Sequence, residues 1–275
     1  MIETVRFSID GSHEDLRALL AYVGLNGSII DYPARSVTYI TLVTGTAEHA
    51  SLESNINKFR VGVRRYRTLE ASPEELASCT LFSNVGCRWI EDDESALEPP
   101  QYTGSDACPE CGKGQREHVV PLTGKLTSLR KSHLVRKSPA LVLVSSRLAA
   151  LFEAPKWSGV EIRPVIEKTT GQESELFREA WVHSILPLMH PSAGLERSVV
   201  PQFCEWCKRV GFQLTSRQPV YAAAILSSAA DWNLSTEWTA PHFVPCPKLI
   251  CSRRVVHELL KLEPSQKWIP VKLVE

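Results

Sequence analysis

Two Cys-x-x-Cys pairs carry the residue types and the spacing of a metal site. The first is Cys108-Pro109-Glu110-Cys111, and the second is Cys204-Glu205-Trp206-Cys207. In each pair, one tight turn can direct two thiolates at the same ion. Zinc prefers four thiolates in a tetrahedron, and a closed shell of four leaves no open position for a substrate. We therefore predict one structural Zn²⁺ site, with Cys108, Cys111, Cys204 and Cys207 as its ligands.

Other interpretations of these cysteines stay open. A Cys-x-x-Cys pair can be a redox motif, but neither pair lies between a clear strand and a clear helix, which is the usual setting of that motif. His118 could replace one cysteine ligand, and the pairs could also bind no metal. Cys251 follows the apolar Leu249-Ile250, so we expect it to be a small buried side chain. The other cysteines outside the pairs, for which metal binding is left open, are Cys79, Cys87 and Cys246.

The charge balance bears on the class of partner. The formal net charge is zero, with 31 basic and 31 acidic residues. A protein that binds polyanions over a large surface is usually clearly basic, so this composition disfavours nucleic acid as the partner. Two local groups of basic residues nevertheless keep a nucleic-acid-associated zinc-ribbon protein open as the alternative. They are Arg60, Arg64, Arg65 and Arg67, and then Lys125, Arg130, Lys131, Arg136 and Lys137.

The start of the sequence and its apolar content bear on location. Residues 1–6 lack the basic start and apolar stretch of a signal peptide. No segment approaches the roughly twenty apolar residues that span a bilayer. We therefore expect a cytoplasmic protein with no membrane span. Cytosolic cysteines stay reduced, so the Cys-x-x-Cys pairs are interpreted as metal or redox sites and not as disulfides.

The N-terminal segment predicts a small α/β unit over residues 1–70. Residues 4–9 alternate like a strand. Ser12 is an expected N-cap with Asp15 three residues on, and Gly24 is an expected helix end. The helix between them presents one apolar face, made of Leu16, Leu19, Leu20 and Val23. Further strands are expected at 28–32, 36–44 and 59–66, the last with its arginines on a solvated face. Ser72-Pro73 predicts the start of another helix.

An acidic, turn-rich stretch at residues 91–107 predicts a surface linker. It suggests two domains, an N-terminal α/β domain over 1–95 and a zinc-knuckle-containing α+β domain over 105–275. The fold class expected for the whole chain is α+β, with a small N-terminal α/β unit followed by a duplicated strand–helix–strand domain that holds the four-cysteine, zinc-ribbon-like site.

The duplication rests on two similar runs, each of which follows a Cys-x-x-Cys pair. In the first, an apolar strand at 140–144 leads into a helix with Leu148, Leu151 and Phe152 inward, then a strand at 160–165. In the second, strand 248–251 leads into a helix carrying Val255, Leu259 and Leu260, then a strand at 268–274 whose proline favours a sheet edge. Trp157 and Trp268 occupy matching places, which favours a packing role. Helices are also expected at 173–186 and 221–231.

The usual catalytic motifs do not occur in this sequence: it has no H-E-x-x-H, G-x-S-x-G, P-loop or G-x-G-x-x-G. An enzyme with an unrecognised site around His183, His190 or His242 stays open as a third hypothesis.

The order of these features resembles that of the double-CXXCG motif proteins of myxobacteria, a family of immunity proteins of contact-dependent toxin systems. Cys108, Cys111 and Gly112 match the first motif, and Cys204 and Cys207 match the second, where Lys208 replaces the glycine of the family. The turns at 144–147 and 251–254 match loosely. The resemblance covers roughly residues 105–275 and implies an immunity protein that neutralises a toxin by direct contact.

These observations lead to one main functional hypothesis. The main hypothesis is a non-enzymatic, zinc-stabilised binding protein with a protein partner, either a toxin or a complex subunit. The alternative is a nucleic-acid-associated zinc-ribbon protein of a bacterial defence or regulatory system.

Overall fold

A computed structural model describes most of the chain. It covers residues 2–32, 35–84, 88–89, 97–98, 108, 121–129, 132–136, 141–152, 156–197, 211–214, 218–239 and 246–275. The chain divides into two compact units, Met1–Glu75 and Leu76–Glu275. Both combine helices with sheets, and strands predominate. At this level the mixed class expected from the sequence is confirmed. In the part of the chain that the structure describes, every helix is too short or too polar to traverse a lipid bilayer.

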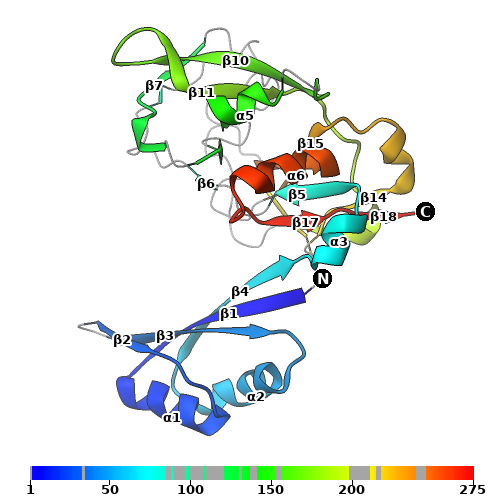
Figure 1. The fold of residues 1–275 in the computed structure, drawn as a ribbon. Coiled ribbons are helices and arrows are strands. Elements are labelled where there is room, and N and C mark those ends of the chain that lie inside the picture. The colour runs from blue at the N-terminus through cyan, green and yellow to red at the C-terminus, as the bar shows by residue number, and fades with distance from the viewer. Residues whose placement is uncertain are drawn as a thin grey trace. The chain divides into compact units, whose positions relative to one another are not determined.

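The first unit is a four-stranded antiparallel sheet with two helices on one face (Figure 1). The strand order is β2-β3-β1-β4. The elements follow one another as β-α-β-β-α-β, and this strand order is then the ferredoxin-like arrangement. Strands β1 and β2 are parallel with β3 between them, and strands β3 and β4 are parallel with β1 between them. The elements are β1 (Ile2–Gly11), α1 (His13–Val23), β2 (Ile29–Tyr32), β3 (Arg35–Val43), α2 (Ala47–Asn55) and β4 (Gly62–Glu70).

Local sequence signals account for α1. The Ser12 side chain accepts a hydrogen bond from the Asp15 amide, and Gly24 ends the helix in the left-handed conformation at φ 69°. The apolar face packs on the inward side chains of β1, as the spacing predicts. The core of the first unit is formed by Val5, Phe7, Ile9, Leu16, Leu19, Leu20, Val23, Ile40, Leu52 and Ile56.

Helix α3 (Pro73–Ser78) begins where the sequence predicts it. The Glu75 amide donates to the Ser72 hydroxyl at 3.3 Å, and the Ser72 amide donates to the Glu75 carboxylate at 2.9 Å. This reciprocal pair satisfies two amides at the start of the helix.

The second unit contains two six-stranded sheets. The first has the order β6-β8-β9-β11-β10-β7, and the second has the order β12-β13-β15-β16-β5-β17. The strands of the first are β6 (Arg88–Trp89), β7 (Leu122–Gly124), β8 (Leu134–Arg136), β9 (Val142–Ser145), β10 (Val160–Glu167) and β11 (Glu173–Val182). Those of the second are β5 (Leu81–Asn84), β12 (Leu195–Arg197), β13 (Phe212–Leu214), β15 (Trp232–Thr239), β16 (Cys246–Ser252) and β17 (Trp268–Pro270). A separate parallel pair joins β14 (Val220–Ala222) to β18 (Lys272–Val274).

The division between the units comes earlier in the chain than the expected linker at 91–107. The reason is β5, which pairs antiparallel with both β16 and β17. Residues 81–84 therefore belong to the interior of a sheet completed by the C-terminal segment, and not to the first unit.

Both predicted strand–helix–strand runs are present. They are β9-α5-β10, with α5 at Ser146–Ala150, and β16-α6-β17, with α6 at Arg253–Leu262. In each run the two strands are parallel and one antiparallel strand lies between them, β11 in the first and β5 in the second. Pro270 ends β17 at the edge of its sheet, as its missing amide hydrogen predicts. Trp157 and Trp268 are both buried in one core, so their expected packing role is confirmed.

Two predicted helices are wrong. Residues 173–182 form strand β11, which pairs with β9 and β10. Phe177, Ala180 and Val182 are buried in this strand, and pairing on both sides outweighs the apolar spacing that also fits a helix. Residues 221–231 contain the end of β14 and a 3₁₀ turn at Ala223–Ser227. Ala223, Ala224 and Leu226 are exposed, so this segment has no continuous apolar face that packing could hold in a longer helix.

The two sheets of the second unit share a core at their junction. The Phe152 ring centroid lies 4.5 Å from that of Trp157 and 5.2 Å from that of Trp232. Beside them, Gly159 adopts φ 82°, and a Cβ there would lie 2.2 Å from the Trp232 carbonyl oxygen. The backbones of the two sheets therefore approach too closely for any side chain at this position.

Gly159→Ala should destabilise the second unit by more than about 3 kcal/mol. The added methyl group would collide with backbone atoms, and the alanine backbone would have to adopt a left-handed conformation. Urea denaturation measures the change. The control is Gly171→Ala, because Gly171 has φ 67° with nothing within 4 Å of the added Cβ. That variant should lose only about 1–2 kcal/mol for the conformation itself. Equal losses in the two variants would contradict the close approach.

Candidate functional site

The predicted zinc ligands lie mostly outside the described residues. Cys108 is described and is 4% exposed. Cys111, Cys204 and Cys207 fall outside the described ranges. Among the residues that are described, no three His, Cys, Asp or Glu side chains are grouped so as to hold a metal ion. Burial of Cys108 suits a thiolate ligand, and the four-cysteine site stays a prediction.

The cysteines of β16 are buried within the second sheet. Cys251 is fully buried, which confirms the small apolar role expected for it. Burial, with a smaller contribution from the nearby Asp231 charge, raises the pKa of the Cys251 thiol well above its usual value. This thiol therefore stays protonated at neutral pH and is a poor nucleophile. Cys246 is also buried, and Cys79 is half-buried.

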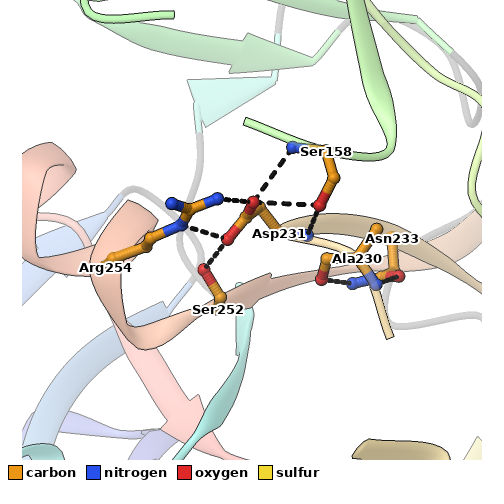
Figure 2. A network of polar contacts seen from close by, with 6 residues as sticks. All are labelled: Ser158, Ala230, Asp231, Asn233, Ser252 and Arg254. Carbon is orange, nitrogen blue, oxygen red and sulfur yellow. Dashed lines mark hydrogen bonds and ion pairs between the residues drawn. The ribbon is translucent and has the colours of Figure 1, made fainter. Parts of the chain in front are cut away.

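The most densely connected polar cluster that the structure describes centres on Asp231 (Figure 2). Its carboxylate accepts hydrogen bonds from the Ser158 amide and the Ser158 hydroxyl, each at 2.9 Å. The Ser252 hydroxyl donates at 2.7 Å, and Arg254 contacts both carboxylate oxygens through Nε and Nη2. The Asp231 side chain is 8% exposed, whereas Arg254 is half exposed.

Backbone contacts extend this cluster. The Asp231 amide donates to the Ser158 hydroxyl at 3.0 Å, and the Trp232 amide donates to the Ser158 carbonyl at 3.1 Å. Asn233, two residues after Asp231, makes further contacts: its Oδ1 accepts hydrogen bonds from Ser184 Oγ and from the Ala230 amide, both at 2.9 Å. The cluster thus joins the turn before β10, the start of β15 and the first turn of α6.

The electrostatics of Asp231 follow from these partners. Burial favours the neutral carboxyl and would raise its pKa. The Arg254 guanidinium, the Ser158 amide and the hydroxyls of Ser252 and Ser158 all favour the charged form and outweigh burial. They hold the pKa of Asp231 well below its usual range. In turn, Asp231 raises the pKa of Arg254 above its usual value.

This chemistry is that of a structural clamp. A carboxylate with a strongly lowered pKa is a weak general base at neutral pH. The hydroxyls of Ser158 and Ser252 donate to it, but the acceptor is too weakly basic to activate them as nucleophiles. What the cluster does is hold three segments of the second unit together through charge-assisted hydrogen bonds.

Two hollows in the second unit offer surfaces for binding. One, of about 540 Å³, lies between the end of α3 and α6 and is lined by Leu76, Ala77, Phe82, Arg253, Val256, His257, Leu260 and Lys261. The other, of about 380 Å³, lies beside α5 and is lined by Ser146, Ala149, Ala150, Phe152, Lys156, Trp157, Val160, Ile162 and Arg178. The first, which we call the α6 groove, has an apolar floor with basic side chains at its edge. His257 and Lys261 are exposed there.

Among the basic residues suggested for nucleic-acid binding, two that the structure describes make internal contacts. Arg65 donates from Nε and Nη2 to the Glu53 carboxylate, each at 2.9 Å. Arg136 is buried and donates to the Pro247 carbonyl at 3.1 Å. Arg60, Arg64 and Lys125 are exposed. The Arg67 side chain and residues Arg130, Lys131 and Lys137 lie outside what the structure describes.

The histidines of the third hypothesis make separate local contacts. His190 caps a 3₁₀ turn by accepting from the Ser192 amide at 3.2 Å. The His183 ring is exposed and lies 5.4 Å from the Trp181 ring, between centroids. His118 and His242 fall outside the described residues.

Asp231 is a site residue that the sequence motifs do not reveal. The one available signal was the Ser252-Arg253-Arg254 turn at the start of α6, because a hydroxyl and two guanidinium groups at one turn favour a carboxylate partner. Nothing in the sequence says that this partner is 21 or 23 positions upstream.

Comparisons with known proteins give no match: no protein-family model fits the chain, and no curated protein or solved structure is significantly similar to it.

Asp231→Asn should reduce the free energy of unfolding at pH 7 by about 2–3 kcal/mol, because a nearly buried charged partner of Arg254 is lost. The folded-state pKa of Asp231 is depressed, so its contribution is fully present above the unfolded pKa, about 4. As the pH falls further, the contribution disappears. Urea denaturation at several pH values should show the difference from wild type narrowing below about pH 4.

Glu98→Gln serves as the control, because Glu98 forms an ion pair with Lys168 in which both side chains are 53% exposed. It should change stability by less than about 0.5 kcal/mol at any pH. A stability difference for Asp231→Asn that stayed constant with pH would show that its charge is not what matters.

Proposed function

We propose that this protein is a zinc-stabilised binding protein that acts by direct contact with a protein partner. The observation that carries the proposal is the α6 groove, where Phe82, Val256 and Leu260 form an apolar floor. Arg253, His257 and Lys261 lie along it. Arg253 donates to the Ser78 and Cys79 carbonyls, and Lys261 pairs with Glu258 at 2.7 Å. Both side chains are exposed, and their positive charge suits an acidic or carboxylate-bearing partner. An apolar centre with a charged edge is the anatomy of a protein interface.

The resemblance to double-CXXCG motif proteins suggests what that partner is. In this proposal the partner is a cognate bacterial toxin, and the protein neutralises it in the cytoplasm as an immunity protein. Strong binding of a toxin needs a rigid surface. The clamp at Asp231 supports this requirement, because Arg254 belongs to the same helix as the groove and ties its first turn to β15.

The four-cysteine centre has a structural role in this proposal. Cys108, Cys111, Cys204 and Cys207 bind one Zn²⁺ and fasten the two strand–helix–strand runs as equivalent halves of a duplicated domain. The shared arrangement of β9-α5-β10 and β16-α6-β17 supports the duplication, since each has parallel strands with one antiparallel strand between them. Burial of Cys108 supports a ligand role for its thiolate.

Purified protein should contain one zinc per chain, measured by elemental analysis. Replacing Cys108, Cys111, Cys204 and Cys207 together by Ser should abolish zinc binding and lower the melting temperature, because metal binding contributes to folding free energy. Cys251→Ala is the matched control, since this buried cysteine lies outside both pairs; it should keep its zinc. Protein purified with no metal, or a quadruple variant that keeps zinc, would disprove the centre.

Co-expression with the toxin encoded in the neighbouring gene should restore growth of a toxin-sensitive host. His257→Glu combined with Lys261→Glu reverses the charge at the edge of the α6 groove and should reduce this protection at least tenfold, measured as surviving colonies. Both side chains are exposed, and the Lys261–Glu258 ion pair that the change removes is a surface pair, so the melting temperature should fall by only a few degrees.

Lys272→Glu is the control, because Lys272 is exposed on β18, which does not line the groove. It should protect as wild type does. Failure of the wild-type protein to protect would refute the immunity role, whereas full protection by the double variant would refute the groove as the contact surface.

A further inference from the structure

The sheet of the first unit has one face that its helices leave uncovered. Side chains of Val5, Phe7 and Ile9 point from β1 to the side where α1 and α2 pack. Because successive side chains of a strand alternate, Arg6 and Ser8 belong to the opposite face. Figure 1 shows both helices on one side of this sheet. We call the opposite side the open face.

Strand register brings chemically related side chains together on the open face. Tyr39 of β3 is paired with Ser8 of β1, and Ser8 is paired with Arg64 of β4. Directly paired residues lie on the same face, so these three form a row across the sheet. Arg6 occupies the next row, opposite Thr41. Three strands that are distant in sequence thus contribute to one surface.

Tyr39 lies at the centre of this surface and is 43% exposed, which is unusual for a tyrosine in an inner strand. Its ring is held by Arg6, whose guanidinium carbon lies 4.7 Å from the ring centroid. The neighbouring positions Ser8 and Thr41 carry short side chains with hydroxyl groups. The tyrosine and the guanidinium therefore present accessible planar groups above a low, polar surface.

Around Tyr39, the charged side chains of the open face that the structure describes are arginines. Arg6 and Arg64 are exposed and have no acidic partner among the residues that the structure describes. Arg35, on the same face two rows from Tyr39, lies 3.6 Å from Asp10 through Nη1, and both ends of this pair are partly exposed. The two arginines nearest to Tyr39 are thus available to an external anion.

We propose that the open face of the first unit binds single-stranded nucleic acid. Bases stack on the Tyr39 ring and the Arg6 guanidinium, while Arg64 pairs with a phosphate. Stacking requires a base that is not already in a duplex, so a single strand is the form that fits a flat sheet. A protein partner fits less well, because the buried centre of a protein interface is apolar, whereas here the positions beside the central tyrosine carry the short hydroxyl side chains of Ser8 and Thr41.

This inference is independent of the α6 groove and of the zinc centre, since every residue that carries it belongs to the first unit. It also differs from the basic groups suggested by the sequence. Of those residues only Arg64 takes part, and Arg65 points to the helix side, where it binds Glu53.

The test uses the full-length protein and fluorescein-labelled oligo(dT) and oligo(U) of about twelve nucleotides, long enough to cover one small binding face. Fluorescence anisotropy at low salt should show binding of both strands and weaker binding of a duplex of the same length. Tyr39→Ala should weaken binding about tenfold, which corresponds to the loss of one stacked base. Tyr39→Phe keeps the ring and should bind as wild type does.

The chain offers a matched control in Tyr22 of α1. Tyr22 is 59% exposed and also has a cation beside its ring, with Lys58 Nζ 5.1 Å from the centroid, but it lies on the helix layer. Tyr22→Ala should leave oligonucleotide affinity unchanged. Arg64→Gln should lower the slope of log affinity against log salt by about 0.7, the value for one phosphate contact on a single strand.

Three results would overturn the proposal. The first is no anisotropy change with either oligonucleotide at low salt. The second is equal loss of affinity in Tyr39→Ala and Tyr22→Ala, which would place binding elsewhere. The third is a wild-type dimer, seen by sedimentation, that Tyr39→Ala dissociates while oligonucleotides do not compete with it. That result would identify the open face as a protein interface.

Discussion

The second unit depends on one buried carboxylate. Asp231 sits at the start of β15 and receives donors from the turn before β10 and from the first turn of α6. Removing a charge from water is costly, and only a full set of partners offsets this cost. The five hydrogen bonds that Ser158, Ser252 and Arg254 donate to it provide that set. Their geometry in turn requires Gly159, since any Cβ there would meet the Trp232 carbonyl. Three features therefore stabilise the junction between the two sheets of the second unit: the Asp231 contacts, the close backbone approach at Gly159, and the aromatic cluster of Phe152, Trp157 and Trp232.

The rigid junction and the surfaces available for binding are separate. Asp231 lies at the meeting point of two sheets, whereas the α6 groove is reached from the exposed positions of α6, and the open face belongs to the first unit. A polar cluster fully used for internal pairing stabilises one arrangement of segments and leaves surface residues free to vary. In this protein the most densely connected polar cluster that the structure describes serves internal pairing, and the groups suited to partners are a few exposed basic side chains and one tyrosine.

Local signals were enough to predict much of the secondary structure. Ser12 and Gly24 mark the two ends of α1, and Ser72-Pro73 marks the start of α3, because caps act within one helical turn. The helix predicted at 173–186 fails because Phe177 and Ala180 have helical spacing and lie on opposite faces of a strand. Only the pairing of β11 with β9 and β10, which allows both faces to be buried, decides the matter. Helix α2 is not among the predicted elements. Leu52 is its one buried residue, so it has no apolar spacing to detect, and its local signal is the Thr46 N-cap, whose hydroxyl accepts from the His49 amide. The partners of Asp231, and the row of Tyr39, Ser8 and Arg64, depend on long-range pairing and register, which no local pattern contains.

The position of β5 has a consequence for how the protein is made. This strand lies early in the second unit, yet both of its neighbours, β16 and β17, come from the last thirty residues of the chain. During synthesis, residues 81–84 leave the ribosome long before either neighbour exists. A buried strand with two open edges invites pairing with other chains until its partners arrive. The second unit therefore completes this sheet only at the end of synthesis. Its folding yield in a cell then depends on how well β5 is protected from pairing with other chains until β16 and β17 have been made.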